Sequence, residues 1–244
     1  MAYAMLLVHS LVLTFQVQPQ AQGGGIEQRI LTWAEEQLQA ESARRGKTLS
    51  LWCRCHEYER DRRVLLRRAG FQQQPWRDLR LMCSLDEPLP SPPLPPGFVL
   101  RSGATPAEWD QYQELHRAVF DGGEMTFDDH QPPTYQPDLD LLAVGADGTF
   151  AAVCCCGLHQ VADASGEYTV GEIGPFGTRP TQRRQGLARV LLLGGMQRIQ
   201  ARGGRTVFLE TEQTNSAALS LFTTVGFQVV SRFRWWIKQI APKR

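Results

Sequence analysis

The spacing of apolar residues in the second half of the chain predicts a strand, a helix, a strand and a helix in succession. Thr169–Thr178 is strand-like in composition, and Leu187–Ala201 carries apolar residues at helical spacing. A further strand is predicted at Arg205–Thr211, and a second helix begins at about Asn215. Strands that alternate with helices in this way indicate an α/β protein.

More elements are predicted upstream in the same half. Phe98–Arg101 is strand-like, and Thr105-Pro-Ala-Glu108 is a capping box with proline at the first helical position, so a helix begins there. The remaining predicted elements are a short helical region near Phe127 and two strands joined by the turn Asp147-Gly148, namely Leu141–Gly145 and Thr149–Leu158.

Composition narrows the function classes. Hydrophobic residues make up 42% of the chain and charged residues 21%, and the net charge is +1, which favours neither nucleic acid nor a membrane surface. The apolar run Met1–Phe15 lacks a preceding basic residue and is too short to span a bilayer.

The consecutive Cys154–Cys156 are interpreted as buried residues of a reducing cytoplasm. Cys53-Arg-Cys55-His56 has no second ligand pair, so no metal is predicted.

The loop between the strand Thr169–Thr178 and the following helix carries the chemistry. It reads Pro180-Thr-Gln-Arg-Arg-Gln-Gly-Leu-Ala188. A helix N-terminus presents unpaired N–H groups and the positive end of its dipole, Gly186 allows close approach of the backbone, and Arg183 and Arg184 add positive charge. The loop is therefore interpreted as a pyrophosphate cradle. It is not a Walker loop, because no Gly-Lys-Ser/Thr follows.

Two motifs in order resemble those of the GNAT N-acetyltransferase superfamily. Arg183, Gly186 and Ala188 fill the acyl-CoA signature Arg/Gln-x-x-Gly-x-Gly/Ala. The run from Asn215 to Phe227 resembles the family's Asn-x-x-Ala-x-x-Leu-Tyr-x-x-x-Gly-Phe helix, with phenylalanine at position 222 in place of tyrosine. The resemblance implies an α/β (α+β) fold with a mixed, mostly antiparallel, splayed sheet flanked by helices, and acetyl-CoA as co-substrate.

The resemblance also implies a set of site residues. In this family the strand before the cradle splays from its neighbour, which suits Gly174-Pro175, and its backbone pairs with pantetheine. Glu172 is the predicted general base, with a pKa raised by apolar neighbours; Glu210 and Glu212 are rivals, and a solvent-facing strand-end glutamate is the structural alternative. The predicted cofactor contacts are Phe176, Gly177, Thr178, Arg183, Arg184, Gln185, Gly186, Leu187, Ala188, Asn215 and Phe222.

The chain also contains two copies of one unit. Phe15, Pro19 and Gly25 align with Phe176, Pro180 and Gly186 at an offset of 161, and Leu65–Phe71 aligns with Leu221–Phe227. The predicted organisation is an incomplete GNAT-like unit at 1–85, a stiff polyproline II linker at 86–97 and a complete unit at 98–244. The first copy is expected to open directly on the strand equivalent to Thr169–Thr178, without the three strands before it. Glu27 in its loop repels a pyrophosphate, so we expect it to bind CoA poorly.

The acceptor is predicted less sharply. Asp121–Asp140 is rich in acidic residues and favours a cationic amine, although a solvated loop explains it equally well. Arg232, Arg234, Trp235 and Trp236 are candidates for binding an anionic or aromatic group. The prediction is an N-acetyltransferase acting on a primary amine of a small molecule or peptide. The alternative is a CoA-binding pseudoenzyme that acts as a sensor or scaffold. The paired layout is similar to that of mycothiol synthase.

Overall fold

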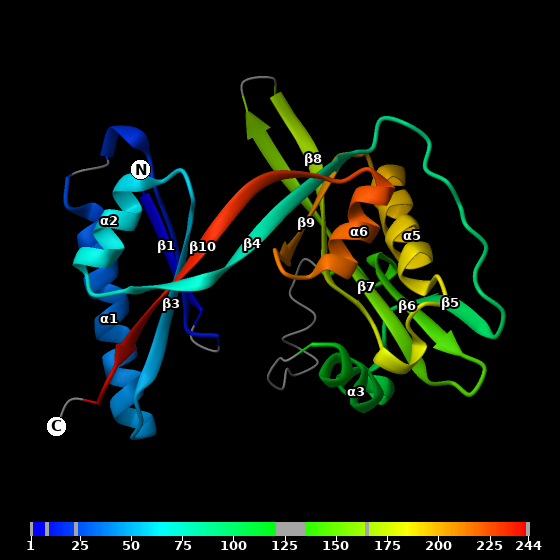
Figure 1. The fold of residues 1–244 in the computed structure, drawn as a ribbon, viewed down its shortest axis with the longest axis horizontal. Helices are drawn as coiled ribbons and strands as arrows, with labels where there is room; N and C mark the ends of the chain where they lie inside the picture. Colours follow the sequence, from blue (N-terminus) through cyan, green and yellow to red (C-terminus); the bar gives the residue numbers. More distant parts are fainter. Residues whose placement is uncertain (1, 8–9, 22–23, 121–134, 164–165, 243–244) are drawn as a thin grey trace. The chain divides into compact units, whose positions relative to one another are not determined.

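The computed structural model describes residues 2–7, 10–21, 24–120, 135–163 and 166–242. The chain divides into two compact units (Figure 1). Unit 1 comprises Met1–Leu79, Glu212–Asn215 and Ser231–Arg244, and unit 2 comprises Arg80–Thr211 and Ser216–Val230. The predicted helical region near Phe127 and most of the acidic run lie outside the described residues.

Unit 2 is built on an antiparallel ladder in which β5, β6, β7 and β8 pair in chain order. Strand β9 joins β8 in parallel, because the helix α5 connects them. The strands are β5 (Phe98–Ser102), β6 (Asp140–Gly145), β7 (Phe150–Asp163), β8 (Gly166–Thr178) and β9 (Gly204–Glu212). The helices are η2 (Pro106–Glu108), α3 (Trp109–Val119), η3 (Pro137–Leu139), η4 (Pro180–Gln182), α5 (Leu187–Ala201) and α6 (Ser216–Val225). This mixed, mostly antiparallel sheet flanked by helices confirms the predicted fold class.

Strand β7 is covered by a helix on each face, and the three consecutive cysteines show this directly. Cys155 belongs to a buried cluster with Tyr112 and Leu115 of α3. Cys154 and Cys156 point the other way, toward α5, where a Cβ added at Gly195 would meet their sulfur atoms at 3.1 and 2.7 Å. Successive side chains of a strand point to opposite faces, so the cysteines fill both layers of the core. All three are free thiols.

Unit 1 repeats the later part of this plan. Its elements are β1 (Ala2–Leu7), β2 (Val12–Val17), η1 (Pro19–Ala21), α1 (Ile26–Arg45), β3 (Leu49–His56), α2 (Arg60–Arg68), β4 (Gln72–Ser84) and β10 (Gln228–Ile240). Strand β3 pairs in parallel with β2 and antiparallel with β10. Leu31 and Leu38 of α1, Leu66 of α2 and the alternate residues Leu51 and Cys53 of β3 share one buried core. The two helices therefore cover one face of this sheet, and the last strand of the chain, β10, lies next to β3 in it.

The expectation that the first copy opens directly on the strand equivalent to Thr169–Thr178 is wrong. The run from residue 2 to residue 17 forms two strands, β1 and β2, which pair antiparallel as β7 and β8 do. The chain reverses near Ser10 and Leu11, where the φ angle of Leu11 is +58°. Within residues 1–85 as described, the copy thus has a counterpart of β7 and none of β5 or β6.

The units of the fold also differ from the boundaries that the repeat suggested. Strands β4 and β10 each begin in one unit and end in the other, so Ser231–Arg244 belongs to unit 1 and Arg80–Ser84 to unit 2 (Figure 1). In unit 2, Arg80 forms a salt bridge with Glu210 of β9 at 2.8 Å. The last strand of each copy therefore extends into the other copy's unit, which a comparison of the two sequences does not reveal.

The proline-rich segment 86–97 contains no helix or strand, as expected for a polyproline spacer, and it lies against α5 within unit 2. Gln197 Nε2 donates to the carbonyl oxygens of Leu89 and Pro90 at 3.3 and 3.1 Å. One turn on, Gln200 Nε2 donates to the carbonyl oxygens of Leu85 and Glu87. Glutamine donors satisfy the carbonyl groups of a segment that has no ladder of its own.

Candidate functional site

Strand β8 leaves β9 before it leaves β7, which opens the sheet at one end. The parallel pairing of β8 with β9 runs from Thr169 to Ile173. The antiparallel pairing with β7 continues to Thr178. Within the described strands, the backbone of Phe176, Gly177 and Thr178 thus has a partner strand on one side only. An open strand edge of this kind can pair with an extended ligand.

A β-bulge marks the point where β8 diverges. Cys154 lies opposite Phe176 and Cys156 opposite Ile173, so a single residue of β7 faces the pair Gly174-Pro175. A bulge bends its strand, and proline donates no ladder hydrogen bond. The Gly-Pro interruption is therefore the local cause of the splay.

Gly177 has a packing role at this site. A Cβ at this position would lie 2.2 Å from Cγ1 of Val119 and 3.2 Å from Cζ of Phe120. The end of α3 therefore approaches the β8 backbone more closely than any side chain at position 177 allows.

The loop from β8 to α5 has the backbone geometry of an anion site. Arg184 and Gly186 have φ angles of +66° and +89°, and left-handed residues in a loop turn N–H groups toward one concavity. Gly186 is the N-cap of α5 and provides no side-chain cap, so the first-turn N–H groups, from Leu187 to Arg189, have no partner within the helix. A Cβ at Gly186 would meet one described atom within 4 Å, Cγ of Pro95 at 3.9 Å. The space in front of the loop is open.

The arginines of the loop differ in their surroundings. Arg183 Nε donates to the Thr178 carbonyl oxygen at 3.2 Å, so this side chain braces the loop against the end of β8. Arg184 is exposed. Gln185 Nε2 donates to Gln182 Oε1 at 2.9 Å. Leu187 is buried under the loop and Ala188 is half-buried. These contacts brace the loop against the end of β8 and the start of α5.

Glu172 lies at the last paired positions before the splay and has a partner that the sequence did not suggest. Its Oε2 is 2.7 Å from Nε2 of His159 on β7, and the two side chains are 45% and 49% exposed. Glu172 is paired with Phe208 in the β8–β9 register, and the His159 and Phe208 rings are 6.1 Å apart. His159 lies thirteen residues earlier on another strand and belongs to no motif, so only strand pairing identifies it.

The two rival glutamates are engaged elsewhere. Glu210 accepts hydrogen bonds from Arg80 at 2.8 and 2.9 Å, and the Arg80 guanidinium lies 4.7 Å above the Phe208 ring. Glu212 accepts from Thr214 Oγ1 at 2.7 Å and groups with unit 1. Glu210 directly follows Leu209, the last β9 residue that pairs with β8, so it also lies at the divergence, and what separates it from Glu172 is that Arg80 holds its carboxylate.

Phe222 and Asn215 of the second motif are predicted to contact the cofactor, and both make contacts within the protein. Phe222 of α6 is 3% exposed, and its ring lies 5.8 Å from Phe176 and 5.9 Å from Phe227. The Phe222 ring therefore packs against Phe176 in the splayed part of β8. Asn215 precedes α6 and groups with unit 1, and its backbone N–H donates to the Glu212 carbonyl oxygen.

The two described members of the acidic run are not free surface charges. Asp138 forms a salt bridge with Arg202. Asp140 is 1% exposed, and its Oδ2 accepts a hydrogen bond from the Tyr135 hydroxyl at 2.8 Å. The part of the run that the structure describes thus gives no support to a cationic acceptor, while residues 121–134 lie outside the described part.

The first copy repeats the glycine-capped loop and has no counterpart of Glu172. Gly25 caps α1 with a φ angle of +77°, as Gly186 caps α5. The last two pairs before the divergence are Val12–Trp52 and Leu13–Cys53 in β2–β3, against Glu172–Phe208 and Ile173–Leu209 in β8–β9. Val12 therefore occupies the place of Glu172. The β1–β2 pairing shows no register shift, so the bulge is missing as well.

We expect one acetyl-CoA site per chain. The first copy has no bulge, and Glu27 lies in the first turn of α1 where the second copy has Ala188, so its cradle repels an anion. Calorimetric titration of the whole chain with acetyl-CoA should give a stoichiometry close to one. A stoichiometry of two would show that the Gly25 loop binds as well.

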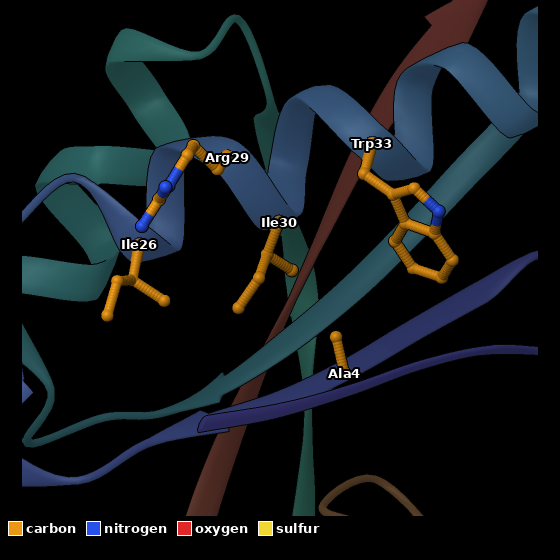
Figure 2. A pocket seen from close by; sticks show the side chains of 5 residues that line it. All are labelled: Ala4, Ile26, Arg29, Ile30 and Trp33. Atoms are coloured by element: carbon orange, nitrogen blue, oxygen red, sulfur yellow. The ribbon is translucent and has the colours of Figure 1, made fainter. Parts of the chain in front are cut away.

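A hollow in unit 1 marks where the first copy lacks strands. It has a volume of about 330 Å³ and is lined by Ala4 of β1 and by Ile26, Arg29, Ile30 and Trp33 of α1 (Figure 2). In unit 2 the corresponding face of α5 is covered, because Gly194, the counterpart of Trp33, lies against Leu141 of β6 and Leu100 of β5. The hollow therefore lies on the face of α1 that strands equivalent to β5 and β6 would cover in a complete copy. It is distinct from the Gly25 loop.

The described part of the chain contains no group of three potential metal-ligating side chains. Burial raises the pKa of the Cys53 thiol to about 12 and that of Cys55 to about 11, which disfavours the thiolate forms that bind metals. Among the described helices, none has the length and hydropathy of a membrane span.

A strand splayed beside a glycine-capped helix, with a glutamate at the point of divergence, defines an acyltransferase fold. The profile described as "Acetyltransferase (GNAT) family" matches residues 106–227, half of the chain. The chain belongs to this family.

Known proteins resemble the chain over more than the matched half. It is 31% identical to a mycothiol acetyltransferase of Thermobispora bispora over 168 residues, which cover 65% of this chain and 56% of that relative. A GCN5-related N-acetyltransferase from Sphaerobacter thermophilus has a TM-score of 0.75 at 23% identity, covering all of this chain and 77% of that one. A tandem GNAT protein from the clavulanic acid biosynthesis pathway has a TM-score of 0.69 at 16% identity, covering 96% and 76%. The chain thus spans little more than half of the first relative, and the solved structures show a shared fold.

Proposed function

We propose that this protein is an acetyl-CoA-dependent N-acetyltransferase that acts on a primary amine of a small molecule or peptide. The observation that carries the proposal is the position of Glu172, which lies at the last paired residues before β8 opens and whose side chain is half exposed. The open β8 edge then pairs with the pantetheine arm of acetyl-CoA, and the Gly186 loop holds its pyrophosphate. Family membership supports the same co-substrate.

The reaction we propose is direct attack. The ammonium form of the acceptor first gives a proton to the Glu172 carboxylate, which passes it to water. The neutral amine nitrogen then forms a bond to the thioester carbonyl carbon, the C–S bond breaks, the CoA thiolate leaves, and a second proton passes from the nitrogen to water. His159 Nε2, 2.7 Å from Glu172 Oε2, holds the carboxylate in one orientation. The backbone beyond the bulge positions the thioester, because proximity and orientation supply much of the rate.

The leaving thiolate needs no tyrosine in this scheme. Phe222 has no hydroxyl and is buried between Phe176 and Phe227. An alkyl thiol ionises near pH 8.5, so a thiolate leaves at neutral pH at a modest cost in free energy. Water then protonates it after the C–S bond has broken.

The face around Glu172 fits a small polar acceptor. Phe208 provides an aromatic surface next to Glu172, and the Arg80–Glu210 salt bridge lies beyond it. The related proteins are mycothiol acetyltransferases, and mycothiol is a small molecule, which supports a small-molecule acceptor over a protein. Glu172 itself attracts an ammonium group before the proton is removed.

A screen of amines with acetyl-CoA, read as release of free CoA thiol, tests the function. We expect at least one primary amine to raise thiol release well above hydrolysis, with the N-acetyl product visible by mass spectrometry. Tight acetyl-CoA binding without transfer to any amine in a broad panel would instead support the CoA-binding pseudoenzyme.

The His159–Glu172 pair gives a separate prediction. His159→Asn should lower kcat roughly 10-fold, because positioning contacts are coupled to the group they orient by about 0.5–3 kcal/mol. In a Glu172→Gln background the same substitution should have little further effect. Gln160→Ala on the same strand, whose side chain donates to Thr169 Oγ1 at 3.0 Å, is the matched control and should leave kcat unchanged. Additive losses in the double variant would contradict a shared role.

A further inference from the structure

Strand β1 is an outer strand of the sheet and has none of the usual protections of an edge. The strand order begins with β1, which pairs with β2 and with no other described strand. Its residues, Ala2–Leu7, include no charged residue and no proline, and its pairing with β2 has no bulge. Charges, prolines and bulges are what usually keep an edge strand from pairing with another chain. The outer backbone groups of β1 are therefore open to a further strand.

Large apolar side chains are exposed beside this open edge. Tyr3 and Met5 of β1 are 59% and 48% exposed, and Trp33 of α1 is 40% exposed. Trp33 and Ala4 line the hollow of about 330 Å³ between α1 and β1 (Figure 2). Clustered apolar side chains on a surface mark a place where another element or molecule binds. The open edge of Ala2–Leu7 and this hollow are here called the β1 surface.

The second copy shows which kind of element covers the equivalent surface. Strand β7, the counterpart of β1, pairs on that side with the antiparallel strand β6. Ala143 of β6 lies opposite Ala152, and Leu141 of the same strand is 3.8 Å from a Cβ placed at Gly194 of α5. The element that fits the β1 surface is therefore an antiparallel strand whose alternate side chains point toward α1.

Trp33 restricts which strand fits there. It stands at the counterpart of Gly194, so an indole projects where the second copy has room for Leu141. A strand that pairs with β1 must therefore carry small side chains toward α1. The sequence of β1 itself meets this requirement, because Ala4 lines the hollow and Ala2, two residues earlier, is on the same face.

We propose that the β1 surface binds β1 of a second copy of this chain, so that the protein forms a two-fold symmetric dimer with one continuous sheet. Two β1 strands related by a two-fold axis run antiparallel, and Ala4 then lies opposite its own equivalent in the other chain. The pairs on either side are Tyr3 with Met5 and Ala2 with Leu6. Opposite residues of an antiparallel pair are on the same face, so this register places both α1 helices on one face.

The charges of α1 agree with a second copy as the occupant. Arg29 lines the hollow, and Glu36 follows it by seven residues, two turns along the same side of the helix. Both residues are exposed, and neither has an ion pair within the described part of the chain. The two-fold axis makes the α1 helices antiparallel, so Arg29 of each chain faces the end of the other helix that carries Glu36. The first copy, which has no counterpart of Glu172, then serves as the assembly module of the protein.

Light scattering after size-exclusion chromatography of the whole chain tests this assembly. We expect twice the mass of one chain, decreasing toward a single mass on dilution. Ala4→Glu and Ala4→Lys each place two like charges opposite one another at the axis, and each should raise the Kd of the dimer at least roughly 100-fold. An equal mixture of the two variants should restore the double mass, because the glutamate of one chain then meets the lysine of the other.

A control variant lies on β5, the strand at the other end of the strand order. Val99 of β5 is 59% exposed, and Val99→Glu should leave the mass of the dimer unchanged. Melting temperatures identify any variant that fails to fold. Ala4 lines an open hollow and is only partly buried, so we expect both of its variants to fold as single chains.

Four results would overturn the proposal. They are a wild-type chain that stays monomeric at every soluble concentration, a folded Ala4→Glu protein that remains a dimer, a variant mixture that stays monomeric, and open-ended species larger than a dimer. The mass is measured without acetyl-CoA or turnover, so failure of this surface and failure of the proposed function are distinguishable.

Discussion

Replacing Gly186 by glutamine should abolish acetyl-CoA binding by the folded protein. The side chain would enter the open space before the α5 N-terminus, where a Cβ has one described neighbour at 3.9 Å, and would exclude a pyrophosphate from the loop N–H groups. Losing two or more hydrogen bonds to a charged group, each contributing about 1.5–3 kcal/mol, corresponds to an affinity loss of at least roughly 100-fold. Calorimetry with acetyl-CoA measures this.

The repeat provides a matched control for backbone strain. A glutamine at a φ angle of +89° costs roughly 1–2 kcal/mol of stability whatever its effect on binding. Gly25 caps α1 at +77° with nothing within 4 Å in the described structure, so Gly25→Gln carries a similar cost in the first copy. It should lower the melting temperature similarly and leave acetyl-CoA affinity unchanged. A folded Gly186→Gln protein with unchanged affinity would remove this loop from the proposed site.

Glu172→Gln should keep acetyl-CoA affinity and lower kcat about 100-fold or more, the usual scale of general base catalysis. Glutamine preserves shape and the contact with His159, so the loss reports on proton transfer. The loss should shrink as pH rises, because a growing fraction of the acceptor amine is already neutral. Initial rates on the best acceptor from pH 6 to pH 10, each with saturating acetyl-CoA, measure this.

Glu210→Gln is the comparison for that experiment. Glu210 lies on the neighbouring strand and is engaged by Arg80 at 2.8 Å. We expect this variant to lose a little stability and to retain most of its turnover. If Glu172→Gln keeps full turnover across the pH range while Glu210→Gln loses it, the base is Glu210 and the proposed geometry is wrong.

The parts of the fold that follow from local sequence were predictable. Leu187–Ala201 was predicted as a helix and is one with the same bounds, because apolar spacing and a glycine at its start act within a few residues. The capping box at Thr105 is present, with both of its hydrogen bonds. The Gly-Pro interruption of β8 was visible in the sequence as well, and the structure shows the divergence at that point.

The features that sequence reasoning missed depend on strand pairing. His159 and Glu172 come within 2.7 Å because a hairpin places β7 beside β8, and no motif connects them. At the constant offset of 161, Val12 would align with Ile173. The bulge adds one residue to β8, so the structural counterpart of Val12 is Glu172 instead. The reversal of the chain near Leu11 has no glycine or proline to mark it, so the sequence of Met1–Phe15 does not indicate two strands.

By itself, the sequence determined the family, the duplicated unit and the glycine-capped start of α5, because these depend on residue types at short, constant spacing. The tertiary structure decided which strands close each unit, which side chain lies beside Glu172, and what stands in its place in the first copy. The physical reason is the pleat of a strand. A shift of one residue in register exchanges the two faces of a sheet, and register is set by partners distant in the chain.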